Sequence, residues 1–155
     1  LSEARNYAIE KASGEFIAFL DVDDRWTPEK LENQIPLFDN PNVGIVYGNY
    51  WFENELINSS RILYKKQLPT GRIINNILRK YEVGLLTLII RRRAFERLEV
   101  PFNARYHTIG DFDLVTRIAL DWEINCFQEP VGYCRWHGDN GSIRHKDIHV
   151  SELEK

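Results

Sequence analysis

The order of apolar and polar positions predicts helices and strands that alternate along the chain. The first twelve residues place Leu1, Ala4, Ala8 and Ala12 three and four positions apart, which is the spacing of one helical face. Five consecutive apolar residues follow at 16–20. A run of this length directly after a helix predicts a strand that is buried on both faces, as in a parallel sheet.

Similar patterns predict elements along the rest of the chain. Thr27 and Pro28 are typical of a helix N-terminus, and the helix that follows them carries Leu31, Ile35 and Phe38 on one side. The other predicted elements are strands at 43–47, 85–90, 123–127 and 131–136, helices at 71–81, at 91–98 and from Gly110 onward, and a hairpin or irregular excursion at 54–68. Strands that alternate with helices indicate the α/β class, with a largely parallel sheet flanked by helices.

An acidic cluster follows the first predicted strand. Asp21, Asp23 and Asp24 lie within four residues, where their negative charges repel one another. A Mg²⁺ or Mn²⁺ ion bound to a diphosphate would relieve this repulsion, because such ions bind one or two carboxylates together with phosphate oxygens and water. The alternative is a solvated turn in which Asp24 or Thr27 caps the next helix. The position of the cluster after a strand makes the metal-site interpretation as well supported as the solvated turn, because ligands of α/β sheets bind beyond the carboxyl ends of the strands.

Composition narrows the class of protein. The chain has 155 residues, of which 43% are hydrophobic, and this is enough for one core. Its net charge of −3 argues against a protein that holds nucleic acid mainly by charge. The longest apolar run, 84–90, is too short to cross a membrane. Cys126 and Cys134 lie in apolar surroundings and are expected to be buried, reduced thiols, which fits a cytoplasmic compartment.

A second acidic segment opens the last predicted helix. It runs Gly110, Asp111, Phe112, Asp113. A carboxylate at position 111 can act as a general base and accept a proton from a reacting group. The alternative is structural: Asp111 would cap the helix, and Asp113 would be a favourable acid in its first turn.

A third candidate segment, 133–142, combines cationic and hydroxyl side chains after the last predicted strand. Arg135 offers a planar set of N–H groups that suits phosphate oxygens. His137 can ligate a metal ion or donate to a phosphate, and Ser142 adds a hydroxyl. The alternative is a hairpin turn at Asn140 with an exposed histidine.

Residues 2–32 resemble the family 2 glycosyltransferases of the GT-A fold. That family carries an A-R-N helix, a strand that ends in F-L-D-x-D-D, and then W-x-P-x-K-L. The present sequence matches all three and departs at Tyr7, where a small residue or Leu is usual. Segment 110–117 is similar to the family's E-D-x-D-L-x-x-R, with Gly110 in place of the Glu. Segment 133–142 is similar to the family's Y-R-x-H-x-x-N-x-S.

The resemblance implies a role for each candidate residue. Asp23 would be the principal ligand of a Mg²⁺ or Mn²⁺ ion, and Asp21 would share that site and face the ribose and diphosphate of a nucleotide. Asp111 would be the catalytic base. Contacts to the nucleotide or the metal would also come from Arg5, Arg135, His137 and Ser142.

The resemblance also implies an activity. A sugar would move from a nucleotide diphosphate donor, most often a UDP-sugar, to a saccharide or lipid-linked acceptor, with inversion of the anomeric centre, in cell-surface polysaccharide synthesis. The protein would work in the cytoplasm or at the inner face of the membrane. The basic run 91–93, with Arg97, would form a solvated face or contact an anionic membrane.

The resemblance begins at Leu1, whereas the family places a strand, a helix and a second strand before its A-R-N helix. Residues 1–142 are therefore expected to be part of a GT-A domain and 143–155 a polar, solvated tail, in which His145 and His149 are weak metal candidates. We expect this chain alone to transfer sugar weakly or not at all. Two alternatives stay open, a nucleotidyltransferase of similar fold and a non-catalytic binding or assembly module.

Overall fold

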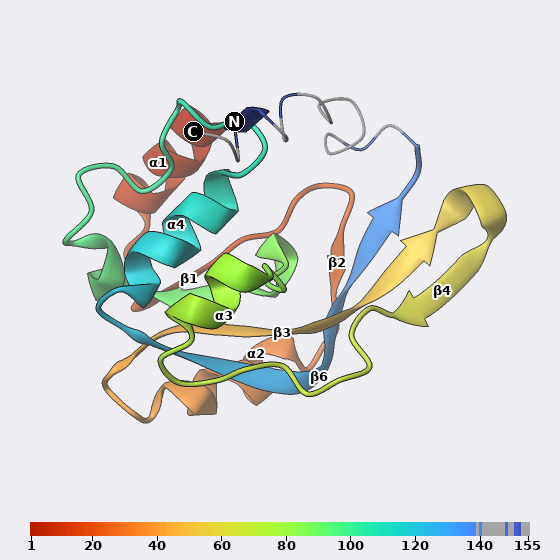
Figure 1. Cartoon of the computed structure of the whole chain (residues 1–155), viewed down its shortest axis with the longest axis horizontal. Helices are drawn as coiled ribbons and strands as arrows, with labels where there is room; N and C mark the ends of the chain where they lie inside the picture. Colours follow the sequence, from red (N-terminus) through yellow and green to blue (C-terminus); the bar gives the residue numbers. More distant parts are fainter. Residues whose placement is uncertain (139, 141–147, 149–150, 153–155) are drawn as a thin grey trace.

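One sheet organises the part of the chain that the computed structural model describes, which is residues 1–138, 140, 148, 151 and 152 (Figure 1). Its strands lie in the order β1-β5-β3-β6-β2, and β4 pairs with β3. The strands are β1 (Phe16–Ala18), β2 (Arg25–Trp26), β3 (Val43–Asn54), β4 (Ser59–Ile62), β5 (Ile89–Arg91) and β6 (Glu123–Trp136). The helices are α1 (Ser2–Lys11), α2 (Lys30–Gln34), α3 (Ile74–Arg79) and α4 (Gly110–Ala119), and 3₁₀ helices lie at Ile35–Phe38, Glu55–Ile57, Leu85–Thr87 and Arg92–Phe95.

Two apolar layers form the core, one on each face of the sheet. The larger layer packs α3 and α4 against the central strands, and Ile45, Leu88, Leu114 and Ile118 are fully buried in it. The smaller layer packs the 3₁₀ helix at 35–38 against other residues of the same strands. Figure 1 shows α3 and α4 above the sheet and α2 below it. Both faces of the central strands are therefore covered.

β3 and β6 form the centre of the sheet and, among the paired strands of the described residues, they alone run parallel. Their register places Tyr47 beside Cys126 and Glu53 beside Arg135. The α/β class is confirmed. The prediction of a largely parallel sheet is wrong, because β5 runs antiparallel to both β1 and β3. An apolar run indicates burial on both faces but does not give the direction of the neighbouring strand.

β1 confirms the first predicted strand in a shorter form. It lies at the edge of the sheet, with β5 beside it. Ile17 is buried, whereas Phe16 and Ala18 are half-buried and Leu20 is 46% exposed. The strand is therefore not buried on both faces as predicted, and the chain leaves the sheet before it reaches the acidic cluster.

The two central strands are longer than predicted. The predicted strands at 123–127 and 131–136 are the two halves of β6, and their register against β3 shifts near Pro130. The strand predicted at 43–47 extends to Asn54, and β4 pairs with its end to form the predicted hairpin. The β3–β6 pair thus continues well beyond the core.

The buried face of α2 differs from the predicted one. Lys30 and Gln34 are buried, whereas Leu31 is 48% exposed. The Lys30 ammonium donates to the Thr87 carbonyl (3.0 Å) and to Gln34, and burial lowers the pKa of Lys30 to about 7. Thr27 does not cap the helix, because its hydroxyl donates to a carbonyl of β6 (3.4 Å). Hydrogen-bonded polar groups therefore take the place predicted for Leu31, whereas Ile35 and Phe38 pack in the smaller layer as predicted.

The basic helix predicted at 91–98 is a single 3₁₀ turn, and its first arginine belongs to β5. Arg91 is buried, its guanidinium lies over the rings of both Phe16 and Phe38, and it donates to the Phe38 carbonyl (2.7 Å). Arg93 donates to a carbonyl of the loop before β3 (2.6 Å). Arg91 therefore cannot form part of a solvated or membrane-facing surface, and the prediction is wrong for it.

The remaining predicted helices form, with changes in length and in buried face. α4 buries Leu114 and Ile118 as predicted, and α3 is shorter than predicted. The predicted face of α1 is wrong, because Leu1, Ala4 and Ala8 are exposed whereas Arg5, Asn6 and Ile9 are half-buried. Cys126 is buried and Cys134 is half-buried, and both are free thiols. No helix in the described part of the chain is long and apolar enough to span a membrane.

Candidate functional site

Arg5 of α1 connects the first helix to the acidic cluster. Its guanidinium donates to both carboxylate oxygens of Asp21, at 2.8 and 3.2 Å, and lies over the ring of Phe102. The neighbouring Asn6 exchanges two hydrogen bonds of 2.8 Å with the Phe102 backbone. These contacts hold α1 against both the acidic cluster and the loop that leads to α4.

The end of β6 approaches the acidic cluster from another direction. His137 Nε2 lies 3.2 Å from Asp23 Oδ2, so the structure brings together two predicted metal ligands that are far apart in the sequence. Asp24 accepts a hydrogen bond from the Arg135 backbone N–H (3.1 Å). Asn140 supports this segment, because it accepts from the His137 N–H (2.9 Å) and donates to the Arg135 carbonyl (2.8 Å). The predicted ligand Ser142, and with it His145 and His149, lies outside the described residues.

The acidic cluster concentrates negative charge in a half-buried loop. Burial raises the pKa of Asp24, the Arg135 N–H opposes this, and the charges of Asp23 and Asp21 add to the rise, so that the pKa is about 6. The loop is therefore a place where an added cation would be stabilised. Within the described residues, no group of three or more His, Cys, Asp or Glu side chains is arranged to hold a metal ion.

The side chain of Arg135 is paired with Glu55, at the turn between β3 and β4. Its guanidinium donates to Glu55 Oε1 at 2.6 and 2.9 Å. Glu55 raises the pKa of Arg135, so the arginine is held as a cation. A phosphate that binds Arg135 must therefore compete with this carboxylate.

Asp111 lies in the first turn of α4, near Arg5. Burial raises the pKa of Asp111, and the opposing influences are the N–H groups of Phe112 and of Asp111 itself, the Tyr81 hydroxyl and the charge of Arg5. The Tyr81 hydroxyl donates to Asp111 Oδ2 at 3.3 Å. The helix cap position is occupied by Ile109, so the structural alternative, in which Asp111 caps the helix, is wrong. The carboxylate is available for chemistry.

Tyr81 is a site residue that the sequence did not reveal. The periodic pattern placed it on the apolar face of a helix, whereas α3 ends at Arg79. Its ring packs edge-on against Phe112 (5.2 Å between centroids), and this contact aims its hydroxyl at Asp111. No signal in the sequence links positions 81 and 111, because only the packing of α4 brings them together.

Glu152 binds the loop that leads into α4. Its buried carboxylate accepts hydrogen bonds from the N–H groups of His107 (2.6 Å), Thr108 (3.0 Å) and Ile109 (3.2 Å), and from the Thr108 hydroxyl (2.8 Å). Burial alone would raise the pKa of Glu152, but these hydrogen bonds outweigh it and lower the pKa to about 2. The prediction of a solvated tail is therefore wrong at this residue.

Two cavities lie outside this group of residues. One of about 590 Å³ lies between β3, the segment after β4 and the middle of β6. The other, of about 680 Å³, lies between α1 and residues 92–101. Neither is lined by the acidic cluster or by Asp111.

Sequence comparison defines the class of this protein. The profile of the family described as Glycosyl transferase family 2 matches residues 1–107, and the chain belongs to that family. Its curated relatives include WfgD of Escherichia coli, named as a UDP-Glc:alpha-D-GlcNAc-diphosphoundecaprenol beta-1,3-glucosyltransferase. WfgD is 40% identical over 99 residues, which are 64% of this chain and 38% of WfgD.

Solved structures show the same fold. S. aureus TarS 1-349 in complex with UDP-GlcNAc matches with a TM-score of 0.65 at 18% identity, over 90% of this chain and 40% of that one. The mannosyltransferase PcManGT from Pyrobaculum calidifontis, in complex with GDP-Man and Mn²⁺, matches with a TM-score of 0.64 at 20% identity. The match covers 99% of this chain and 41% of PcManGT. The fold is that of the GT-A glycosyltransferases. The chain spans about two fifths of the length of these proteins.

The contacts of Glu152 predict a pH-dependent contribution to stability. Glu152→Gln should lower the free energy of unfolding at pH 7 by about 2 kcal/mol, because one amide oxygen cannot accept from all of these donors. The folded pKa of about 2 lies below the ordinary value of 4.5, so the contribution is complete above pH 4.5 and is lost as the pH falls toward 2.

Urea unfolding of the native and variant proteins at pH 7 and at pH 3 measures this contribution. The difference in stability should be smaller at pH 3. The control Glu99→Gln, at an exposed position, should change stability by less than about 0.5 kcal/mol at either pH. A difference for Glu152→Gln that is equal at both pH values would contradict the assignment.

Proposed function

We propose that the protein containing this chain transfers a sugar from a nucleotide diphosphate donor to an acceptor hydroxyl, with inversion of the anomeric centre. One observation carries the proposal. Arg5 donates two hydrogen bonds to Asp21, and its charge also lowers the pKa of Asp111, so Arg5 lies near both the acidic cluster and the candidate base. Family membership favours this function over a nucleotidyltransferase or a non-catalytic module.

The acidic cluster is the proposed binding site for the diphosphate. Asp23 and His137 offer a carboxylate oxygen and an imidazole nitrogen 3.2 Å apart, a donor set that suits a Mg²⁺ or Mn²⁺ ion, with Asp21 beside it. When bound, such an ion neutralises charge on the leaving diphosphate. Arg5 adds cationic N–H groups at one end of the cluster, and the Arg135 backbone N–H donates to Asp24 at the other. The Arg135 guanidinium would join the site by exchanging its contact with Glu55 for a phosphate oxygen. These side chains would hold the nucleotide diphosphate while its bond to the sugar breaks.

Asp111 is the proposed catalytic base. It would accept the proton of the acceptor hydroxyl as that oxygen forms a bond to the anomeric carbon. The bond from this carbon to the diphosphate breaks at the same time, and its electron pair leaves with the diphosphate. Burial raises the pKa of Asp111, which makes it a stronger base, and the Tyr81 hydroxyl orients its carboxylate.

The substrate classes follow from the relatives. WfgD is named for a UDP-sugar donor and a lipid diphosphate acceptor, and TarS is seen with UDP-GlcNAc. We infer a UDP-sugar donor and a saccharide or lipid-linked acceptor for this protein, at the inner face of the membrane during assembly of a surface polysaccharide. Because the chain spans about two fifths of its relatives, the activity is proposed for the whole protein, and the chain alone is expected to be weak or inactive.

Asp111→Asn tests the proposed base. In the whole protein it should lower the rate of transfer from a UDP-sugar by between about 10² and 10⁴-fold, and leave donor binding within about twofold. The matched control is Asp113→Asn on the same helix, where Asp113 is paired with Arg117 (2.7 Å); it should retain most of the activity. Equal losses of transfer rate in both variants would contradict the assignment of Asp111 as the base.

Tyr81→Phe tests how the base is held. The Tyr81 hydrogen bond lowers the pKa of Asp111, so its removal should shift the acidic limb of the rate–pH profile to higher pH by about one unit. The rate at high pH should change little, because Asp111 is then deprotonated in both proteins. Tyr7→Phe, at an exposed position, is the control. An unchanged profile would show that Tyr81 does not act on the base.

Asp23→Asn tests the proposed metal site. Titration of Mn²⁺ in the presence of UDP, followed by electron paramagnetic resonance, should show binding at least about tenfold weaker than in the native protein. Asp39→Asn, at an exposed position outside the cluster, should bind Mn²⁺ normally. Equal affinities in the three proteins would place the metal elsewhere.

A further inference from the structure

The β3–β4 hairpin combines an exposed apolar tip with basic side chains, and we propose that it docks the protein on an anionic lipid surface. In Figure 1 the hairpin extends away from the helices, on the side opposite to α1. Its turn is the 3₁₀ helix Glu55–Ile57, closed by Asn58 in the left-handed conformation (φ 46°). The inference rests on the proposed function only for its purpose, which is to reach a lipid-linked acceptor.

The tip exposes two large apolar side chains next to each other. Leu56 is 65% exposed and Ile57 is 71% exposed. The neighbouring carboxylate of Glu55 is paired with Arg135, at 2.6 Å, so it is directed toward β6. An apolar tip of this size can enter the boundary between lipid headgroups and acyl chains.

The segment that returns from the tip is basic. Arg61 is exposed on β4, and Lys65 and Lys66 are exposed in the segment that follows it. The acid on the facing strand, Glu53, is neutralised by Arg25 at 2.6 Å. The hairpin therefore presents positive charge on a chain of net charge −3, and an anionic surface would attract this face of the molecule.

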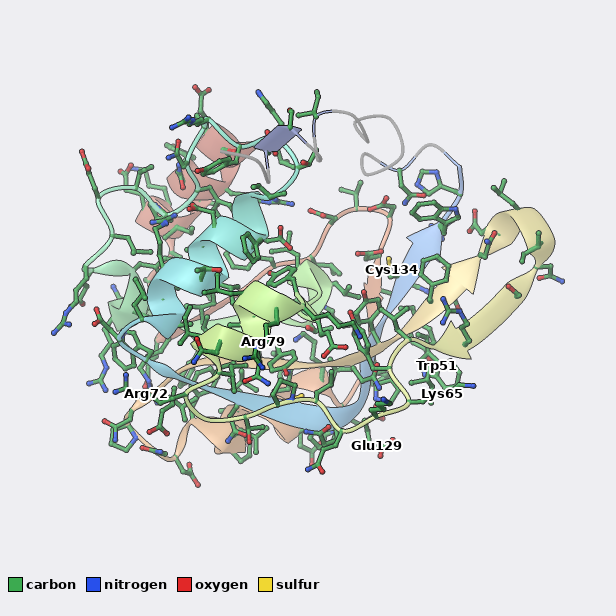
Figure 2. The ribbon with its side chains drawn as sticks, viewed as in Figure 1. Trp51, Lys65, Arg72, Arg79, Glu129 and Cys134 are labelled. Atoms are coloured by element: carbon green, nitrogen blue, oxygen red, sulfur yellow. The ribbon has the colours of Figure 1, made fainter. Side chains whose placement is uncertain are left out.

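A cavity at the foot of the hairpin adds a place for a lipid phosphate. Its volume is about 590 Å³, and Trp51, Lys65, Lys66 and Glu129 are among its lining residues. Figure 2 shows Trp51 and Lys65 beside each other there, with Glu129 below them. Tryptophan is enriched at the level of lipid headgroups, where its ring is buried and its N–H is solvated.

A bilayer fits these features better than a protein partner does. Two apolar side chains are a small area compared with the roughly 800 Å² that each partner of a stable protein complex buries. Shallow apolar insertion beside lysines and arginines is the combination by which proteins bind membrane surfaces. The Glu55–Arg135 pair links the hairpin to the end of β6, so docking would bring lipid close to the proposed active site.

Vesicle sedimentation tests the proposal without any reaction. The protein should bind vesicles of phosphatidylglycerol mixed with phosphatidylcholine, and this binding should weaken as salt is added. It should bind vesicles of phosphatidylcholine alone poorly. Leu56→Ser with Ile57→Ser, and separately Lys65→Glu with Lys66→Glu, should each weaken binding at least about tenfold. Circular dichroism should show that both variants remain folded.

Matched controls lie elsewhere on the surface. Leu78→Ser with Leu120→Ser removes two side chains that are 58% and 63% exposed, and it should leave vesicle binding unchanged. Arg72→Glu with Arg79→Glu makes the same change in charge at positions away from the hairpin (Figure 2), and it should weaken binding much less than the hairpin variant does. Equal effects of hairpin and control variants would overturn the proposal.

Further outcomes separate the alternatives. Full competition by inorganic phosphate would indicate a phosphate site in place of a membrane surface. Self-association that is lost in the Leu56→Ser, Ile57→Ser variant, without vesicle binding, would assign the tip to a second copy of the chain. Both results would overturn the proposal.

Transfer assays separate this inference from the proposed function. The hairpin variants of the whole protein should retain transfer to a water-soluble acceptor and lose it to the same acceptor anchored in anionic vesicles. Absence of transfer to either acceptor in the native protein would contradict the proposed function, while the vesicle sedimentation result would still decide the docking surface.

Discussion

The parallel pairing of β3 with β6 is the constraint on which the rest of the molecule depends. In its first half, where Tyr47 lies beside Cys126, both strands are buried and support α3 and α4. In its second half, where Glu53 lies beside Arg135, the same pair leaves the core and carries the end of β6 to the acidic cluster. A change of register would therefore alter the core and the candidate site together.

Charge pairing between separate elements gives the candidate site its shape. Arg5 of α1 meets Asp21, His137 meets Asp23, and the Arg135 side chain meets Glu55 across the sheet. These pairs are partly exposed, so each contributes little to the free energy of folding. Their effect is on position, because they hold two arginines and a histidine beside a loop whose carboxylates repel one another.

The sequence predicted best where local pattern and burial agree. α4 follows its apolar spacing closely, and Leu114 and Ile118 are buried as expected. α2 does not, because Lys30 finds a carbonyl acceptor in the core while Leu31 faces solvent. Apolar periodicity assumes that only apolar side chains are buried, and it fails where a polar side chain has a partner inside. Arg91 shows the same failure.

The sequence by itself determined the α/β class, the family resemblance and the candidate acids, because these depend on motifs in which each residue is read together with its neighbours. The tertiary structure decided which candidate residues lie close together, and it places His137 next to Asp23. It also supplied two partners that no motif contains, Tyr81 for Asp111 and Glu152 for the start of α4. Hydrogen bonds between residues far apart in the sequence form only where the fold brings those residues together. Strand direction and helix packing decide this, and local periodicity specifies neither.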